Sequence, residues 1–525
     1  MMVVVVARAK PDRRNPRPVA IDRLGLTVLG LLSLALVDAH AQPDTGGDAS
    51  RPFAITPSIT ANETLTNNAN LTPTDRRPDL ITQVSPGLQL RSAAGWAQGY
   101  LNYSLIGLTY ARSTSPDSMQ QSLETAVQTQ MLDHHLFVDA NASISRQNIS
   151  ALGTQTPDAS LHTDNQTQVE SLALTPYLQG TLAGNVAYRL GGDYATMHSG
   201  SEGIGNSTNS GGSAHLGTAQ TTARMGWGLD VSDEETSFSQ GRSTTNKSAV
   251  GSLIFSPDGE LQFTLRGGRE GNDVETLNLK YDTTYGGGLT WKPSERTTLV
   301  LQDDKRYFGD AYTFSFQHRT SQTVWMVSDS RQVIDNGSAA SQGQLMTAFD
   351  LIYLQLASKY PDPVTRASQT LLELQALGLN PLVVVPSGFL TDAVSLQRNL
   401  SFSVAYIGLR TSLLLSALQG DTSRLDPLSS AVDSLSDGSA IRQRSISLSA
   451  SQRLTPLSSA NLTLSESRTL DRNSGSRVAL RTITANWVTQ LGMRTNFSLG
   501  ARRSISFGDS PYTESALLAT LSLQI

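Results

Sequence analysis

The sequence predicts an all-β fold, an antiparallel transmembrane β-barrel of the outer-membrane type, on three observations. The chain starts with an export-type leader, contains few charged residues, and alternates apolar with polar residues over many short segments. Charged residues make up 16% of the chain, against about 25% in typical soluble domains, yet the mean hydropathy is only −0.21. Low charge without high hydropathy is typical of strands that face lipid on one side and water on the other.

The first 41 residues have the pattern of a signal peptide. A basic segment leads into the apolar run 24–37, and Ala39-His40-Ala41 is a small-x-small cleavage pattern. The run is shorter than the roughly 20 residues of a spanning helix, so we expect cleavage after Ala41 and a mature chain of residues 42–525. Removing 1–41 takes away six of 40 basic and three of 45 acidic residues, which leaves 34 and 42 and a formal net charge of −8. That charge argues against a nucleic-acid partner.

The barrel prediction rests on strands with one apolar face. In a strand, successive side chains point to opposite faces, and the end of the chain shows this pattern in Leu517, Ala519, Leu521, Leu523 and Ile525. Similar runs near 136–145, 186–194, 261–266, 312–319 and 400–406 have about the 9–11 residues that cross a membrane at a tilt. From residue 53 onward we predict about 18–22 strands. We expect the last strand to pair with the strand near Phe53 and so remove the open edge.

The connections between the predicted strands are of two kinds. Short segments with Pro or Gly occupy 256–259, 292–295, 454–457 and 491–494, and longer ones occupy 148–165, 197–217 and 424–438. Outer-membrane barrels place short turns in the periplasm and long loops outside. Trp96, Trp291 and Trp487 lie close to short turns, where an aromatic girdle is expected.

Residues 336–397 interrupt the strand pattern. Leu345, Phe349, Ile352 and Leu356 recur at helical spacing, and a second run, 364–377, follows an Asp-Pro start at 362–363 and precedes a glycine. This predicts a helical insert between strands. Because its apolar faces need cover, we expect it to act as a cap or plug of the barrel.

No residue pattern in the chain predicts catalysis, a cofactor or a metal site. The chain has no cysteine and no G-x-S-x-G motif, and adjacent His134 and His135 would point to opposite strand faces. The polar faces are more informative, because Arg189, Arg266 and Arg319 lie on them among small polar residues. We predict that these arginines line the lumen, where they would hold water, fix an inserted plug or guide an anionic polymer.

The chain also resembles a known family along the whole mature sequence. Residues 285–298 (YGGGLTWKPSERTT), 305–309 (KRYFG), 316–320 (FQHRT), 360–367 (YPDPVTRA) and 55–59 (ITPSI) are similar to the uncharacterised outer-membrane proteins associated with PEP-CTERM/exosortase systems. The resemblance implies a role in exopolysaccharide production and export in Gram-negative bacteria. It carries over no catalytic residue.

Three functions remain open from the sequence. The first is a non-enzymatic outer-membrane barrel that assists export or surface attachment of an exopolysaccharide, with outer-membrane lipid, the outer-membrane assembly machinery and periplasmic export components as partners. The alternative is a general diffusion porin for small solutes, although the insert argues against an open channel. An envelope enzyme acting on lipid or glycan is the least supported, because neither a nucleophile–base motif nor a carboxylate-pair motif occurs.

Overall fold

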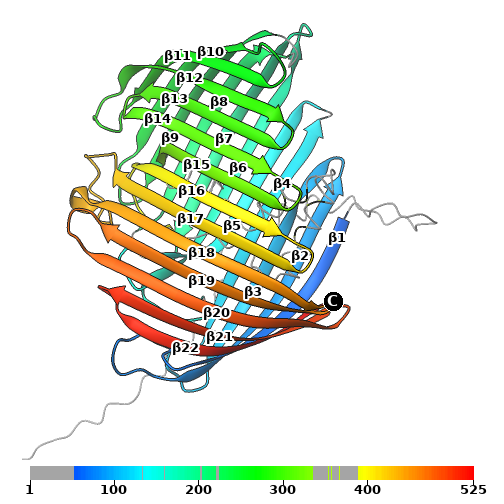
Figure 1. Cartoon of the computed structure of the whole chain (residues 1–525). Coiled ribbons are helices and arrows are strands. Elements are labelled where there is room, and N and C mark those ends of the chain that lie inside the picture. The colour runs from blue at the N-terminus through cyan, green and yellow to red at the C-terminus, as the bar shows by residue number, and fades with distance from the viewer. Residues whose placement is uncertain are drawn as a thin grey trace, which may run out of the picture. The chain divides into compact units, whose positions relative to one another are not determined.

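The strand prediction is confirmed: the chain forms a closed antiparallel barrel of 22 strands (Figure 1). The structure is a computed structural model that describes residues 53–525, except 133, 159, 202–203, 220–223 and 335–387, of which only Tyr353, Leu356, Arg366 and Thr370 are described. The first eleven strands are β1 (Phe53–Thr66), β2 (Asp79–Ala94), β3 (Ala97–Tyr110), β4 (Ser118–Leu132), β5 (Leu136–Asn148), β6 (Gln166–Leu182), β7 (Val186–Ser199), β8 (Ser207–Thr218), β9 (Met225–Phe238), β10 (Thr244–Phe255) and β11 (Leu261–Asn272). The others are β12 (Lys280–Ser294), β13 (Thr297–Arg306), β14 (Gly309–Arg319), β15 (Thr323–Ile334), β16 (Ser395–Ile407), β17 (Thr411–Arg424), β18 (Ala440–Thr455), β19 (Ser458–Asp471), β20 (Arg477–Gly492), β21 (Thr495–Gly508) and β22 (Tyr512–Gln524).

The barrel closes between its first and last strands, as predicted. Strand β22 pairs antiparallel with β1, from Ser58 opposite Gln524 to Thr66 opposite Ala516, and the Ile525 N–H donates to the Pro57 carbonyl at 2.8 Å. Each strand therefore has two neighbours, so backbone N–H and C=O groups along the sheet are satisfied within it. That satisfaction is what a sheet needs inside a bilayer.

The two ends of the barrel differ in their connections. Links from an even- to an odd-numbered strand are two to six residues long, whereas the opposite end has the long ones, among them 149–165, 335–394 and 425–439, the last with a 3-10 turn η2 (Ser436–Gly438). We call these the turn end and the loop end. Outer-membrane barrels keep their short turns in the periplasm, so the loop end faces the outside.

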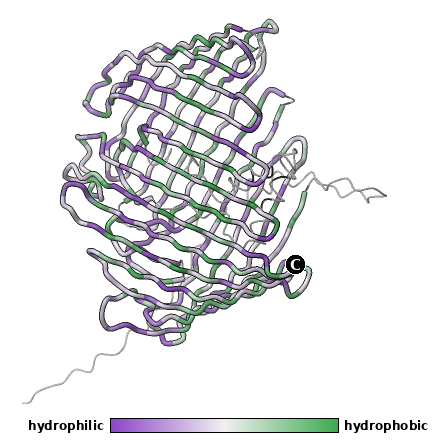
Figure 2. Tube along the Cα trace, viewed as in Figure 1, coloured by the Kyte–Doolittle hydropathy of each residue, from purple (hydrophilic) through white to green (hydrophobic). Residues whose placement is uncertain are grey.

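The outward face of the barrel is an apolar belt, and the two-residue alternation along the strands is visible in Figure 2. The predicted face of β22 is on this side, where Leu517, Leu521 and Leu523 are exposed. All five tryptophans lie near the turn end with 42–45% of their surface exposed (Trp96, Trp227, Trp291, Trp325 and Trp487). They form the aromatic girdle expected at a membrane interface.

One predicted loop is wrong and one prediction lies outside the described residues. The Gly/Ser/Asn-rich stretch 197–217 is mostly strand, because β7 runs to Ser199 and β8 begins at Ser207. Strand β8 keeps a glycine where space is tight: a Cβ on Gly211 would lie 2.7 Å from the Asp233 carbonyl oxygen of β9. The helical insert 336–397 falls mainly outside the described residues, and β16 starts at Ser395. No helix in the described part of the chain is long and apolar enough to cross a membrane.

Candidate functional site: the lumen and its outer mouth

The inner face of β7–β14 carries ion pairs, and we call it the charged wall. Arg266 of β11 pairs with Asp304 of β13 at 3.1 Å, and Arg306 of β13 pairs with Glu270 of β11. Further along the wall, His215 Nδ1 lies 2.7 Å from Asp230 Oδ1. His215 and Asp230 are direct cross-strand neighbours, which lie only about 5 Å apart at Cβ. Arg266 and Asp304 are two strands apart and meet across Gly286 of β12, which is opposite both of them in the register. The charges of the wall are thus largely neutralised within it.

A glycine makes room for the Arg266–Asp304 pair. A Cβ on Gly286 of β12 would lie 2.1 Å from Asp304 Oδ1 and 2.3 Å from the Asp303 carbonyl oxygen. Real Cβ atoms do not approach other atoms this closely, so the side chain of Asp304 occupies the space above a bare backbone. The glycine-rich stretch around 286 therefore positions a carboxylate of the lumen.

The inner face of β15–β22 and β1 is different, and we call it the hydroxyl wall. Apart from Arg502 and Glu514 toward the loop end, its side chains between the ends of these fully described strands are uncharged and mostly Ser, Thr, Asn or Gln. Several pair across neighbouring strands: Ser328 with Ser401 at 2.6 Å, Ser416 with Ser447 at 2.7 Å, Thr482 with Ser504 at 3.3 Å and Thr60 with Ser522 at 3.2 Å. The lumen is therefore two-sided, with charges on one side and neutral hydrogen-bonding groups on the other.

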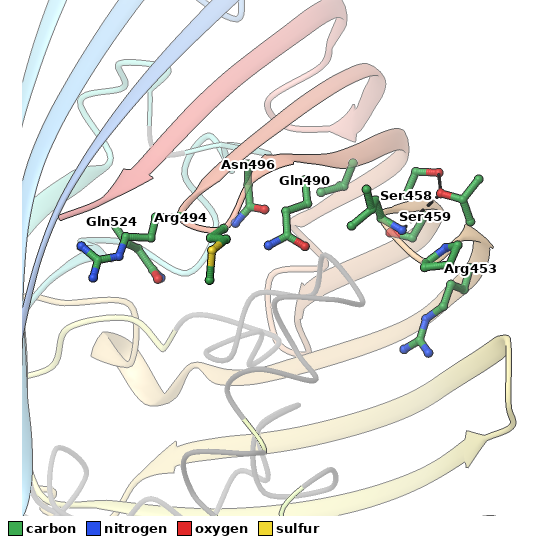
Figure 3. Close-up of a pocket in the computed structure, with 12 residues that line it drawn as sticks. Arg453, Ser458, Ser459, Gln490, Arg494, Asn496 and Gln524 are labelled. Atoms are coloured by element: carbon green, nitrogen blue, oxygen red, sulfur yellow. Dashed lines mark hydrogen bonds between the residues drawn. The ribbon is translucent and has the colours of Figure 1, made fainter. Parts of the chain in front are cut away.

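At the turn end, the hydroxyl wall contains a polar hollow of about 260 Å³ (Figure 3). Ser459, Gln490, Asn496 and Gln524 of β19–β22 line it. Figure 3 shows Arg453 and Arg494 on opposite sides of Ser459, Gln490 and Asn496, with Gln524 beside Arg494. The hollow extends the hydrogen-bonding surface of this wall to the turn end, where Arg453 and Arg494 add positive charge.

At the loop end, the loop between β5 and β6 folds inward across the mouth. Its Asp158 binds Arg502 of β21 at 2.5 Å, and its Gln155 carbonyl accepts a hydrogen bond from Tyr512 of β22 at 2.6 Å. Leu161 of the same loop is fully buried in an apolar cluster with residues of β2, β3, β20 and β22. The loop thus reaches strands that lie several positions away around the barrel.

Arg502 is the centre of this contact. It lies on the inner face of β21 with 4% of its side chain exposed, and its Nη2 is 3.0 Å from Oε1 of the fully buried Glu514. Glu514 also accepts a hydrogen bond from the Thr66 hydroxyl at 3.0 Å. One buried arginine therefore joins the closing strands β21, β22 and β1 to the β5–β6 loop.

A second element crosses the mouth: residues 388–394, which we call the strap. The strap leads into β16, and yet Leu390 N donates to the carbonyl of Asn148 at the end of β5 at 3.2 Å. In a ring of 22 strands, β5 and β16 are on opposite sides. The strap therefore spans the opening of the barrel.

Carboxylates hold the strap in place. Asp433 of the β17–β18 loop accepts the Thr391 hydroxyl at 2.6 Å and is itself bound by Arg424 at 2.6 Å. Asp392 of the strap in turn accepts a hydrogen bond at Oδ1 from the backbone N–H of Gly205, in the β7–β8 loop, at 2.8 Å. Burial raises the pKa of Asp392 above its ordinary value, and the nearby negative charge of Asp433 adds to that shift.

The loops from opposite sides also touch each other directly. The Ser150 and Ser434 hydroxyls are 3.2 Å apart, and Ala151 packs with Leu435, which is fully buried. The largest buried clusters of the described residues therefore gather at the loop end. The outer mouth is bridged by packed, hydrogen-bonded loops.

The three arginines predicted from the sequence occupy separate places. Arg266 is in the charged wall, Arg189 lies 3.8 Å above the ring of Tyr177 on the inner side of β6 and β7, and Arg319 ends β14 at the turn end. The sequence reasoning missed Arg502 and Glu514. Their only sequence signal is their place on the polar faces of the last two strands, and nothing local marks the loop that binds them.

Comparisons with known proteins identify the fold class alone. No protein-family model matches the chain, and no curated protein matches it. Among solved structures, the chain is similar to the siderophore receptor PirA from Acinetobacter baumannii, with a TM-score of 0.46 and 9% identity over 90% of this chain and 80% of that one. It is also similar to the enterobactin-bound ferric enterobactin receptor PfeA (TM-score 0.45, 8% identity, 90% and 81% covered) and the outer membrane protein opdK (0.32, 9%, 90% and 99%), both from Pseudomonas aeruginosa.

Proposed function

We propose that this protein is a non-enzymatic outer-membrane β-barrel that assists the export or surface attachment of an exopolysaccharide, in a PEP-CTERM/exosortase-type system. The observation that carries the proposal is the two-sided lumen. A wall of neutral hydroxyl and amide groups runs from the turn end toward the bridged mouth. Sugar hydroxyls donate and accept hydrogen bonds, and so do the side chains of this wall.

The hydroxyl wall suits a moving polymer better than a bound one. Ser and Thr side chains that already pair across strands, such as Ser416 with Ser447, can exchange one hydroxyl partner for another. A neutral hydrogen bond contributes only about 1 kcal/mol net, so many equivalent weak sites favour passage over retention. A charged polymer would instead compete with the ion pairs of the opposite wall.

The bridged mouth supports gated rather than free passage. The strap and the β5–β6 loop meet the β17–β18 loop across the opening, and a polymer would need these contacts to part. A general diffusion porin is the second candidate, and the polar inner face is compatible with it. The loops across the mouth weigh against it, because a porin keeps a water-filled channel.

A gene deletion with complementation tests the proposal. We expect the deletion to reduce secreted or surface-attached polysaccharide and the wild-type gene to restore it. A gene with Ser416→Leu and Ser447→Leu in the hydroxyl wall should give an assembled barrel but little polysaccharide. Thr411→Leu, on the outward face of β17, is the matched control and should restore it fully. Unchanged polysaccharide in the deletion strain would contradict the proposal.

A further inference from the structure

Toward the loop end, and leaving aside Arg477 at the first residue of β20, the outward face of β15–β21 carries seven arginines, which we call the arginine band. They are Arg331, Arg398, Arg442, Arg444, Arg468, Arg481 and Arg503. The same face of these strands carries three carboxylates, Asp329, Asp421 and Glu466. The band therefore has an excess of four positive charges on the outer surface of a chain whose formal net charge is −5.

The register sets like charges directly opposite each other in this band. Arg331 of β15 is the cross-strand partner of Arg398 of β16, and Arg444 of β18 is the partner of Arg468 of β19. Directly opposed like charges destabilise a sheet. Two such pairs on one surface indicate a place where an anion would offset the repulsion.

The available carboxylates are already engaged by other arginines of the band. Asp329 binds Arg398 through two hydrogen bonds of 3.1 and 2.6 Å, and Asp421 binds Arg442 at 2.6 Å. Glu466 is shared by Arg468 and Arg481. These three carboxylates are therefore already paired and do not neutralise the remaining arginines.

The remaining three arginines donate hydrogen bonds to neutral acceptors. Arg331 donates to the Asp310 carbonyl at 2.6 Å, Arg444 to the Gln419 side-chain oxygen at 2.8 Å and Arg503 to the Ser515 hydroxyl at 3.0 Å. A guanidinium has five N–H donors in a planar fork that matches the oxygens of a phosphate. The arginine band therefore offers guanidinium N–H donors to a phosphate group.

The position of the band relative to the apolar belt identifies the kind of anion. Directly toward the turn end, the same strands expose Leu400, Ile446, Leu464 and Ile483. From Arg481 to the exposed Leu491 there are ten residues of β20, about 33 Å along the strand and about 25 Å across the membrane at a tilt near 40°, which is the height of the lipid-facing band. The arginine band thus lies at the outer boundary of the bilayer core.

We propose that the arginine band binds the phosphate-bearing head group of a glycolipid in the outer leaflet, whose acyl chains lie on the apolar belt below. The ligand is amphiphilic, as the surface is. Its phosphates bridge the opposed arginine pairs and turn a repulsive arrangement into a bound one. This site is on the outside of the barrel and is independent of what passes through the lumen.

Lipid titration of the purified full-length protein in detergent tests the proposal. A lipid-A-type glycolipid with two phosphates and its phosphatase-treated form are added separately, and bound copies are counted by native mass spectrometry. We expect the phosphorylated form to bind about tenfold or more tightly, since loss of a charge-assisted contact commonly weakens binding by about that factor. Equal affinity for the two forms would overturn the proposal.

Variants locate the site. Arg331→Gln with Arg444→Gln leaves no carboxylate unpaired and should weaken binding of the phosphorylated form about tenfold for each arginine removed. Without lipid the thermal stability of this variant should be equal or higher, because two like-charge contacts are gone. Arg410→Gln, in the exposed β16–β17 turn at the opposite end, is the control and should bind as the wild type does.

If the double variant fails to assemble, Arg444→Gln alone carries the comparison with Arg410→Gln. If Arg444→Gln binds as tightly as the wild type, or if Arg410→Gln weakens binding equally, the band faces water or a protein and the assignment is wrong.

Discussion

Replacing Arg502 by methionine is predicted to destabilise the outer mouth strongly. Arg502 is the ion partner of both Glu514, which is fully buried, and Asp158 of the β5–β6 loop. Removing one member of a buried ion pair leaves an uncompensated charge and costs about 3–5 kcal/mol. Asp158 has 23% of its side chain exposed, so water can hydrate it, and most of the loss comes from Glu514.

The double variant Arg502→Met with Glu514→Leu separates charge from packing. Replacing a whole buried ion pair by apolar groups is often close to neutral, so we expect it to recover most of the stability lost in the single variant. Arg503→Met is the matched control, because Arg503 is exposed on the outward face and its side chain donates to the neutral Ser515 hydroxyl. Guanidinium unfolding in detergent, followed by tryptophan fluorescence, gives the free energies, and protease cleavage within 149–165 reports loop release. An Arg502→Met protein as stable as the Arg503→Met protein would refute the reasoning.

Three further predictions concern the lumen and the strap. Gly286→Ala should destabilise the barrel by about 1–3 kcal/mol through overpacking against Asp304, whereas Gly267→Ala, with open space at its Cβ, should be nearly neutral in the same unfolding assay. The raised pKa of Asp392 means that its stabilising contribution is present at acidic pH, below the ordinary carboxyl pKa, and is lost as pH rises through the raised value. Bilayer conductance should therefore rise as the pH is increased from below the ordinary carboxyl pKa and the strap loosens. Asp392→Asn should reduce this rise, and an unchanged rise would exclude Asp392 as its cause. Replacing residues 336–392 by a short Gly/Ser linker should raise the single-channel conductance of the assembled barrel, and an unchanged conductance would show that the strap does not limit the opening.

The strand alternation was enough to predict the barrel, because a strand that faces lipid must repeat every two residues. Leu517, Leu521 and Leu523 lie outward as that period requires, and the pairing of β22 with β1 follows from the need to remove an edge. The same rule failed at 197–217, where glycines and serines gave no apolar face although the backbone still pairs as β7 and β8.

The bridged mouth had no comparable signal in the sequence. Ser150 and Ser434 are 284 residues apart and meet only because the closed ring brings their loops together. Arg502 and Asp158 are 344 residues apart. Contacts of this kind depend on loop conformation and carry no periodicity, so the sequence indicated a cap or plug but not the loops and the buried arginine that bridge the mouth.

Planar-bilayer recording with a neutral oligosaccharide tests the central claim, that a gated barrel passes a hydroxyl-rich polymer. The intact protein should give little steady current. The protein without residues 336–392 should give an open current that a neutral oligosaccharide added at the turn end blocks in discrete events, and Ser416→Leu with Ser447→Leu should shorten those blocks. A large, steady current from the intact protein that oligosaccharides do not interrupt would contradict the account and favour a diffusion porin.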